Sequence, residues 1–147
     1  MAPDRPQQLV VFSLGAEEYA LPIGEVQEII HYTEPRSVAS KAPWIRGVIS
    51  LRGKIIPVCD LATRLGVASN AGEASKIVVV ERESGIAGVI VDDVAEVLTI
   101  EPDQLDEAPA AGAEIVEGVV QVGDRLVVVL SADGIFGDVQ AAATASV

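Results

Sequence analysis

The residues of this chain that can perform chemistry are few and lie far apart in the sequence. His31 is the single histidine and Cys59 the single cysteine, so the sequence offers no histidine metal cluster and no evident pair of general bases. We expect His31 at the surface. Cys59 ends an apolar strand and is expected to be a buried core thiol. A nucleophilic Cys59–His31 pair is the alternative that these residue types leave open.

Two neighbouring acids, Asp92 and Asp93, are the remaining candidates for metal chemistry. Carboxylates suit hard cations, but adjacent residues of a strand point to opposite faces of a sheet, so we interpret both as solvated acids. The sequence also has no Gly-rich phosphate loop, zinc-ligand spacing or nucleophile elbow. We therefore predict a protein that is not an enzyme and uses no catalytic residue, metal or other cofactor.

The composition limits the classes of partner. Aromatic residues make up 3% of the 147 residues and the net charge is -12, which opposes binding to nucleic acid and to anionic membrane surfaces. The N-terminus lacks the apolar run of a signal peptide, and no stretch approaches the length of a membrane span. A single cysteine suits a reducing compartment. These features predict a cytoplasmic protein.

The charge is unevenly distributed along the chain. Residues 1–66 carry seven cations and seven acids, whereas residues 67–147 carry three cations and fifteen acids. Six of the ten cations lie in residues 36–64, where Asp60 is the one opposing acid. A locally basic region beside an acidic half suits oriented contacts with other proteins. Solubility alone is an equally open explanation.

Strand signals dominate the first half. Apolar, β-branched runs separated by a short break predict a hairpin over residues 9–22, and a second hairpin is expected around Gly53 in residues 47–58. Apolar residues at helical spacing predict a short amphipathic helix over about 22–30. Asp60 is expected to cap another short helix that Gly66 ends.

The second half repeats this pattern. Residues 94–97 match residues 26–29 at an offset of 68, and residues 118–129 match residues 47–58 at an offset of 71. Two blocks that agree within three residues indicate an internal duplication. The sequence therefore predicts two small antiparallel β units, each closing on itself because open strand edges invite aggregation.

Three residues of the first half are candidates for a functional role. Trp44, the only tryptophan, lies beside Pro43 in an irregular stretch flanked by cations; it either plugs the core or makes a contact. Arg52 stands just before the turn glycine Gly53, where its planar guanidinium can pair with a carboxylate. Glu28 is the candidate partner, and a solvated turn arginine is the alternative.

Several segments, taken together and in this order, resemble the CheW domain family. Each is weak alone, but as a set they are specific, although the asparagine usual before Leu-Arg-Gly is Ser50 here. The segments are Leu9–Ala20, Val26–Ile29, Trp44–Ile49, Leu51–Gly53 and Ile56–Leu61.

The resemblance implies a mainly β fold with two small SH3-like five-stranded β-barrel subdomains, short helices and a hydrophobic seam between the barrels. It covers residues 8–137 as a single CheW-like domain. The subdomains would span roughly 8–67 and 76–137, and an exchange of terminal strands between them is left open. Residues 1–7 and 138–147 are expected to be flexible termini.

The resemblance further implies a non-enzymatic adaptor in a bacterial two-component chemosensory system. Its partners would be the regulatory domain of the histidine kinase CheA, docked on the first subdomain, and the cytoplasmic tip of a chemoreceptor, docked at the seam. The protein would lie in the cytoplasm at membrane-proximal receptor arrays, without inserting into the membrane or binding nucleic acid. Other CheW-like domains, arranged in rings, are a further partner that the resemblance allows.

The family's functional motif falls on Arg52 and Glu28, with Val26 beside Glu28. We add Ile30, Trp44 and Arg46 as predicted partner-binding residues. The output served, flagella, pili or another, is not fixed by the sequence. A small ligand-binding or hydrolytic domain that relies on Cys59 and His31 is the alternative from a different class.

Overall fold

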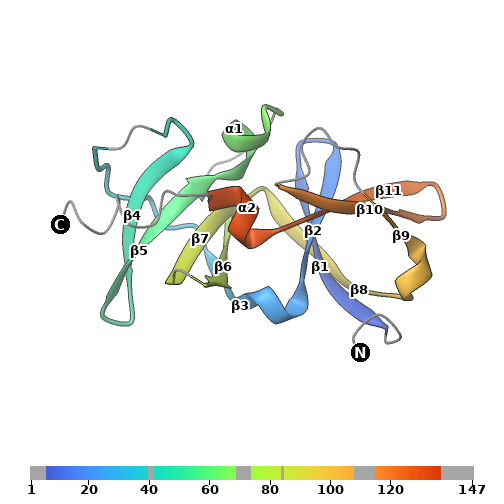
Figure 1. Ribbon diagram of the computed structural model, residues 1–147. Coiled ribbons are helices and arrows are strands. Elements are labelled where there is room, and N and C mark those ends of the chain that lie inside the picture. Colours follow the sequence, from blue (N-terminus) through green and yellow to red (C-terminus); the bar gives the residue numbers. More distant parts are fainter. Residues whose placement is uncertain (1–5, 40–41, 69–73, 84, 108–114, 137–147) are drawn as a thin grey trace.

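A computed structural model describes residues 6–39, 42–68, 74–83, 85–107 and 115–136 of the chain. Within these residues the protein is mainly β, with two sheets side by side and two short α-helices (Figure 1). The predicted mainly β class is therefore confirmed. The predicted flexible termini fall almost wholly outside the described residues.

The chain consists mainly of strands, and short helices lie between some of them. In chain order they are β1 (Gln7–Leu14), β2 (Glu17–Pro22), the 3₁₀ helix η2 (Ile23–Glu25), β3 (Val26–His31), β4 (Ile45–Leu51), β5 (Lys54–Asp60), α1 (Leu61–Leu65), β6 (Lys76–Arg82), β7 (Gly85–Val91), β8 (Asp93–Ile100), the 3₁₀ helix η3 (Pro102–Gln104), β9 (Leu105–Glu107), β10 (Val116–Val122), β11 (Arg125–Leu130) and α2 (Ala132–Phe136).

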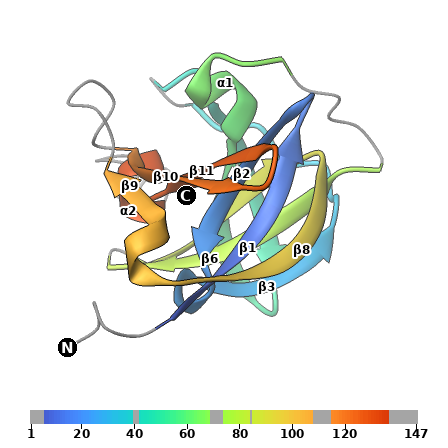
Figure 2. The same cartoon turned by 90° about the vertical axis from the view of Figure 1, so that its right-hand side faces the viewer.

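Each sheet combines strands from both halves of the sequence. The six-stranded sheet has the order β8-β1-β2-β11-β10-β9 and the five-stranded sheet the order β3-β6-β7-β5-β4. Thus the hairpin β1–β2 is completed by strands of the second half, and the hairpin β6–β7 by strands of the first. Figure 2 shows the six-stranded sheet from its outer side, with β8 and β1 curving together.

The exchange between halves has consequences for the predicted subdomains. The divisions 8–67 and 76–137 separate the two similar halves of the sequence, but neither half contains a complete sheet. One sheet has the predicted five strands, and the other has six because the short strand β9 joins it. Closure of each sheet into a barrel, and the subdomain boundaries themselves, stay predictions.

The prediction of an amphipathic helix over residues 22–30 is wrong. A single 3₁₀ turn is followed directly by β3, which pairs with β6 and exposes alternate residues. Val26, Ile29 and Ile30 are β-branched and suit a strand, and pairing with a buried strand overrides a helical spacing in so short a segment. The matching residues 94–97 likewise lie on a strand, β8.

Other local predictions are confirmed. The hairpins β1–β2, β4–β5 and β10–β11 have the expected positions. The Asp60 carboxylate accepts a hydrogen bond from the Thr63 amide at the start of α1, and Gly66 ends that helix in the left-handed conformation. The doubled architecture is also present, since β4–β5–α1 and β10–β11–α2 are equivalent in order.

The core has three parts, and the largest lies between the sheets. Cluster members from β1 and β2, such as Phe12 and Leu21, meet β6 and β7 residues such as Val78, together with Phe136 of α2. Two smaller clusters fill the six-stranded and the five-stranded sheet. Strands β1 and β6 contribute to two clusters each, so both of their faces are buried. This explains their uninterrupted apolar sequences.

Two equivalent glycines allow a crossing segment to approach a strand. A Cβ atom on Gly47 of β4 would lie 2.0 Å from the Arg36 carbonyl oxygen, and one on Gly118 of β10 would lie 2.5 Å from the Asp106 carbonyl oxygen. Gly47 also has a φ of +151°. The two positions are related by the offset of 71 that relates the two hairpins.

We therefore predict that Gly47→Ala destabilises the protein by roughly 1–3 kcal/mol or more, as expected for overpacking against backbone. Gly24→Ala is the matched control, because a Cβ there would meet no atom within 4 Å, and should change stability by less than about 0.5 kcal/mol. Urea unfolding of the two variants measures the difference. Equal stabilities would contradict the close approach at Gly47.

Candidate functional site

Arg52 and Gly53 form the two-residue turn that joins β4 to β5. Their φ angles are +51° and +82°, as in a type I′ hairpin turn. Arg52 is the one non-glycine residue with positive φ among the described residues. Asn or Gly usually fills this position, and a side chain as large as arginine is strained there. An outlier of this kind points to a role for the side chain.

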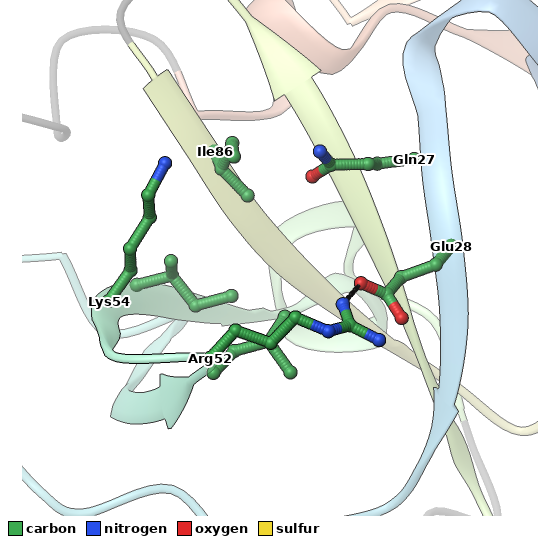
Figure 3. A pocket seen from close by; sticks show the side chains of 7 residues that line it. Gln27, Glu28, Arg52, Lys54 and Ile86 are labelled. Atoms are coloured by element: carbon green, nitrogen blue, oxygen red, sulfur yellow. Dashed lines mark hydrogen bonds and ion pairs between the residues drawn. The ribbon is translucent and has the colours of Figure 1, made fainter.

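The Arg52 side chain reaches from the turn to Glu28 on the edge strand β3. One guanidinium nitrogen donates to the Glu28 carboxylate and forms an ion pair with it (Figure 3). The Arg52 side chain is 71% exposed and that of Glu28 is 25% exposed. The predicted Arg52–Glu28 pair is therefore present, and the guanidinium of Arg52 remains accessible to a partner.

The ion pair has a clear pH dependence. The hydrogen bond from Arg52 lowers the pKa of the Glu28 carboxyl, so the pair is formed at neutral pH and its contribution is lost as the pH falls through that lowered pKa. A pair this exposed contributes little to stability.

A hollow of about 110 Å³ lies beside the ion pair. Apolar side chains of Leu51, Ile56 and Ile86 lie next to polar ones from β3 and the turn. In Figure 3, Gln27 and Lys54 lie on opposite sides of Ile86, and Arg52 points toward Glu28. A small apolar surface rimmed by oriented charges is typical of a protein contact.

Val26 and Ile30, the other predicted residues of β3, are partly buried. Val26 packs against the central cluster and Ile30 against the cluster of the five-stranded sheet. Between them, Ile29 is 41% exposed. The structure thus brings Val26 and Ile30 near Glu28 on one strand, but as supports of the strand more than as free contact residues.

Trp44 and Arg46 lie at the other end of β4 from Arg52, roughly 20 Å away along the strand. Arg46 forms an ion pair with Asp60 at 3.1 Å. Trp44 is partly buried, makes an edge contact with Phe136 and lies under the Arg64 guanidinium at 4.4 Å. Trp44 therefore packs against the core, and the six predicted residues do not form one cluster.

The short helix α2 is tied to the first half of the chain at both ends, which sequence analysis missed. The Glu25 carboxylate accepts a hydrogen bond from the Ala132 amide at 3.1 Å. Arg64 donates to the carbonyl oxygens of Ile135 at 2.8 Å and Gly134 at 3.3 Å. An acid at the first turn and a cation at the last match the helix dipole. No local sequence signal relates residues seventy or more positions apart.

A second arginine–glutamate cluster was also missed, because the repeat relates only its glutamate, Glu96, to the first cluster. Arg125, the first residue of β11, forms ion pairs with Glu18 of β2 and Glu96 of β8. Glu96 is the residue that the offset of 68 relates to Glu28. Arg125 is equivalent to Lys54 and not to Arg52, so the equivalent glutamates are paired with arginines from different positions of the last hairpin of each half.

The candidate catalytic residues are not brought together. His31 is exposed at the end of β3, whereas Cys59 is fully buried on β5. Two strands separate β3 from β5, which places them roughly 14 Å apart. Asp92 accepts from the Gly15 amide, while Asp93 accepts from the Val94 amide. The described residues contain no group of three potential metal ligands.

The described part of the chain also has no helix that is both long and apolar enough to cross a membrane. Its surface presents an oriented ion pair and a shallow apolar hollow, and no constellation for bond-making chemistry within the described residues. Fold and site together define a doubled two-sheet β protein with the features of a binding module.

Comparison with known proteins then gives the family. The CheW-like domain family matches residues 8–140, and the chain belongs to this family. Chemotaxis protein CheW of Klebsiella aerogenes is 31% identical over 131 residues, which is 84% of this chain and 78% of that protein. Chemotaxis protein CheW of Bacillus subtilis is 28% identical over 134 residues, which is 88% of this chain and 86% of that protein.

A solved structure agrees with the fold. The crystal structure of the scaffolding protein TtCheW from Thermoanaerobacter tengcongensis is 34% identical and superposes with a TM-score of 0.83. The match covers 90% of this chain and 94% of that one. The resemblance found in the sequence is therefore confirmed at the level of family and fold.

The buried position of Cys59 generates a prediction. Burial raises the pKa of its thiol strongly, so the reactive thiolate is not formed at pH 8. We expect an aromatic disulfide reagent to leave the native protein unmodified over an hour and to label it once in urea. Rapid labelling of the native protein would contradict the burial of Cys59.

Proposed function

We propose that this chain is a non-enzymatic adaptor that couples chemoreceptors to the histidine kinase CheA in a bacterial chemosensory complex. The single observation that carries the proposal is the Arg52–Glu28 ion pair, held on a strained turn and exposed to solvent. Both residues stand where the resemblance places the functional motif of the CheW domain. Family membership of the chain supports the same reading.

The partners follow from the family resemblance. We propose that the regulatory domain of the kinase and the cytoplasmic tip of a chemoreceptor bind this chain, in the cytoplasm beside receptor arrays. Other CheW-like domains in rings are a further candidate partner. Six of the ten cations lie in residues 36–64 of an otherwise acidic chain, which favours oriented docking.

The proposed mechanism is thermodynamic. An adaptor that binds receptor and kinase at once can transmit a receptor conformation if it contacts the two receptor states differently. No covalent step is required. The two sheets share one continuous core cluster, so both ends of the adaptor can act as one body.

The central variant is Arg52→Glu. Reversing this exposed charge places two acids together and should leave the fold intact, with an unfolding temperature within a few degrees of the parent. We expect binding to the receptor tip or to the kinase regulatory domain to weaken at least tenfold, about 1.4 kcal/mol. Titration calorimetry with each partner measures the loss.

Lys76→Glu is the matched control, because it makes the same charge change in the same sheet, on β6, without removing the ion pair, and Lys76 does not line the hollow beside Arg52. It should bind within about twofold of the parent, corresponding to roughly 0.4 kcal/mol. An equal loss in both variants would show that net charge, and not the pair, governs binding. Unchanged binding by Arg52→Glu to both partners would remove its proposed role.

Added salt tests the contribution of the basic region. If residues 36–64 meet an acidic surface of a partner, the affinity should fall several-fold between about 0.05 M and about 0.5 M salt, because the Debye length shortens. The Gly24→Ala protein, with its charges unchanged, should show the same slope. A flat response would exclude electrostatic docking.

One alternative to this proposal is an adaptor that serves pili or another output. A pilus or other output is not distinguished by the site, but the relatives that match most of this chain are named for chemotaxis. Protein PilI of Pseudomonas aeruginosa is 33% identical over 56% of this chain and 47% of that protein.

A hydrolytic domain relying on Cys59 would lose its activity in Cys59→Ala, whereas an adaptor would keep its binding.

A further inference from the structure

Strand β3 carries a β-bulge beside the ion pair. Its pairing with β6 shifts by one residue between Val26 and Glu28, so Gln27 has no partner on β6. Adjacent residues of a regular strand point to opposite faces of the sheet, whereas a bulge re-aims a side chain. Gln27 and Glu28 are adjacent, yet both line the hollow beside Arg52. The bulge therefore brings a second polar side chain of β3 to the site.

The other sheet contains the equivalent bulge without a polar side chain. On β8, the residue that has no partner on β1 is Ala95, between Val94 and Glu96. The offset of 68 that relates Glu96 to Glu28 also relates Ala95 to Gln27. Because alanine is sufficient at this place in the fold, forming the bulge does not require the amide group of Gln27.

The amide group of Gln27 is available to a partner. The residue is exposed, and its side chain makes no hydrogen bond to any residue that the structure describes. Figure 3 shows this side chain extending from β3 toward Ile86, on the same side of the strand as Glu28. A side-chain amide carries both donors and an acceptor. It can therefore pair with the N–H and C=O groups of another protein's main chain.

The size and lining of the hollow define what it can hold. Its volume is about 110 Å³, whereas pockets for drug-sized small molecules measure about 300–1,000 Å³. Its apolar walls come from Leu51, Ile56 and Ile86. A hollow of this kind suits one aliphatic side chain of a protein partner, and Gln27 at its rim would then lie beside the peptide groups that flank that side chain.

We propose that Gln27 is a partner-binding residue that recognises the main chain of the docked protein. This inference rests on the proposed adaptor function and adds a specificity-determining residue to its site. The partner inserts an aliphatic side chain into the hollow, and the Gln27 amide bonds to a peptide group next to that side chain. Arg52 and Glu28 supply the charged part of the same contact. A bulge residue that the fold does not need as a polar group thus acts in binding.

Gln27→Met in the full chain tests this role, because methionine keeps the length of the side chain and removes its amide. In titration calorimetry we expect the affinity for the receptor tip or for the kinase regulatory domain to fall roughly fivefold or more, since a peptide group of the partner is left unpaired. The urea midpoint of the variant should equal that of the parent. Ala95→Gln, which alters the equivalent bulge, is the matched control and should bind within about twofold of the parent.

Nuclear magnetic resonance gives a second readout, which a merely structural role would not move. The side-chain amide signals of Gln27, assigned by their loss in Gln27→Met, should shift when the partner binds, while those of the exposed Gln121 on β10 should not. Parent-like binding of Gln27→Met to both partners, or unshifted Gln27 signals in the complex, would overturn the proposal and leave the adaptor function intact. Absence of binding by the parent protein would instead contradict the adaptor function, and this inference with it.

Discussion

The whole architecture depends on burying both faces of the hairpins β1–β2 and β6–β7. The apolar runs of these hairpins have no polar face, so both faces of each hairpin must be covered by other elements. Strands from the opposite half of the sequence cover one face, and the neighbouring hairpin with α2 covers the other. The exchange of strands follows from this requirement, because a half alone would leave a face of its hairpin in water.

The exchange also positions the site. Glu28 and Arg52 both belong to the first half, but β3 pairs with β6 and β5 pairs with β7. The ion pair therefore spans the five-stranded sheet through strands of the second half. A similar span in the other sheet joins Arg125 to Glu96 and Glu18. Charged pairs built on the equivalent glutamates Glu28 and Glu96, on surfaces that carry no other chemistry in the described residues, fit a protein that works by contact.

Local features were predictable from the sequence because each rests on a few neighbouring residues. Gly53 marks a hairpin, and Asp60 with Gly66 bounds α1. The Arg52–Glu28 pair was expected from residue type and family motif. The helix predicted over residues 22–30 was wrong because helical and strand periods are hard to separate in nine residues. Pairing with β6 decides that the segment forms a strand. The hydrogen bonds from Glu25 and Arg64 to α2, and the exchange of strands between the two halves, join residues that are 30 or more positions apart, and no local pattern encodes such contacts.

Binding of the full chain to its cognate receptor tip and kinase regulatory domain, separately and together, tests the proposed coupling role most directly. Sedimentation velocity with each partner and with the mixture distinguishes the possible complexes. For a coupling protein we expect each partner to bind alone and the mixture to form one larger complex containing all three proteins. Failure to bind either partner, or displacement of one partner by the other, would contradict a coupling role.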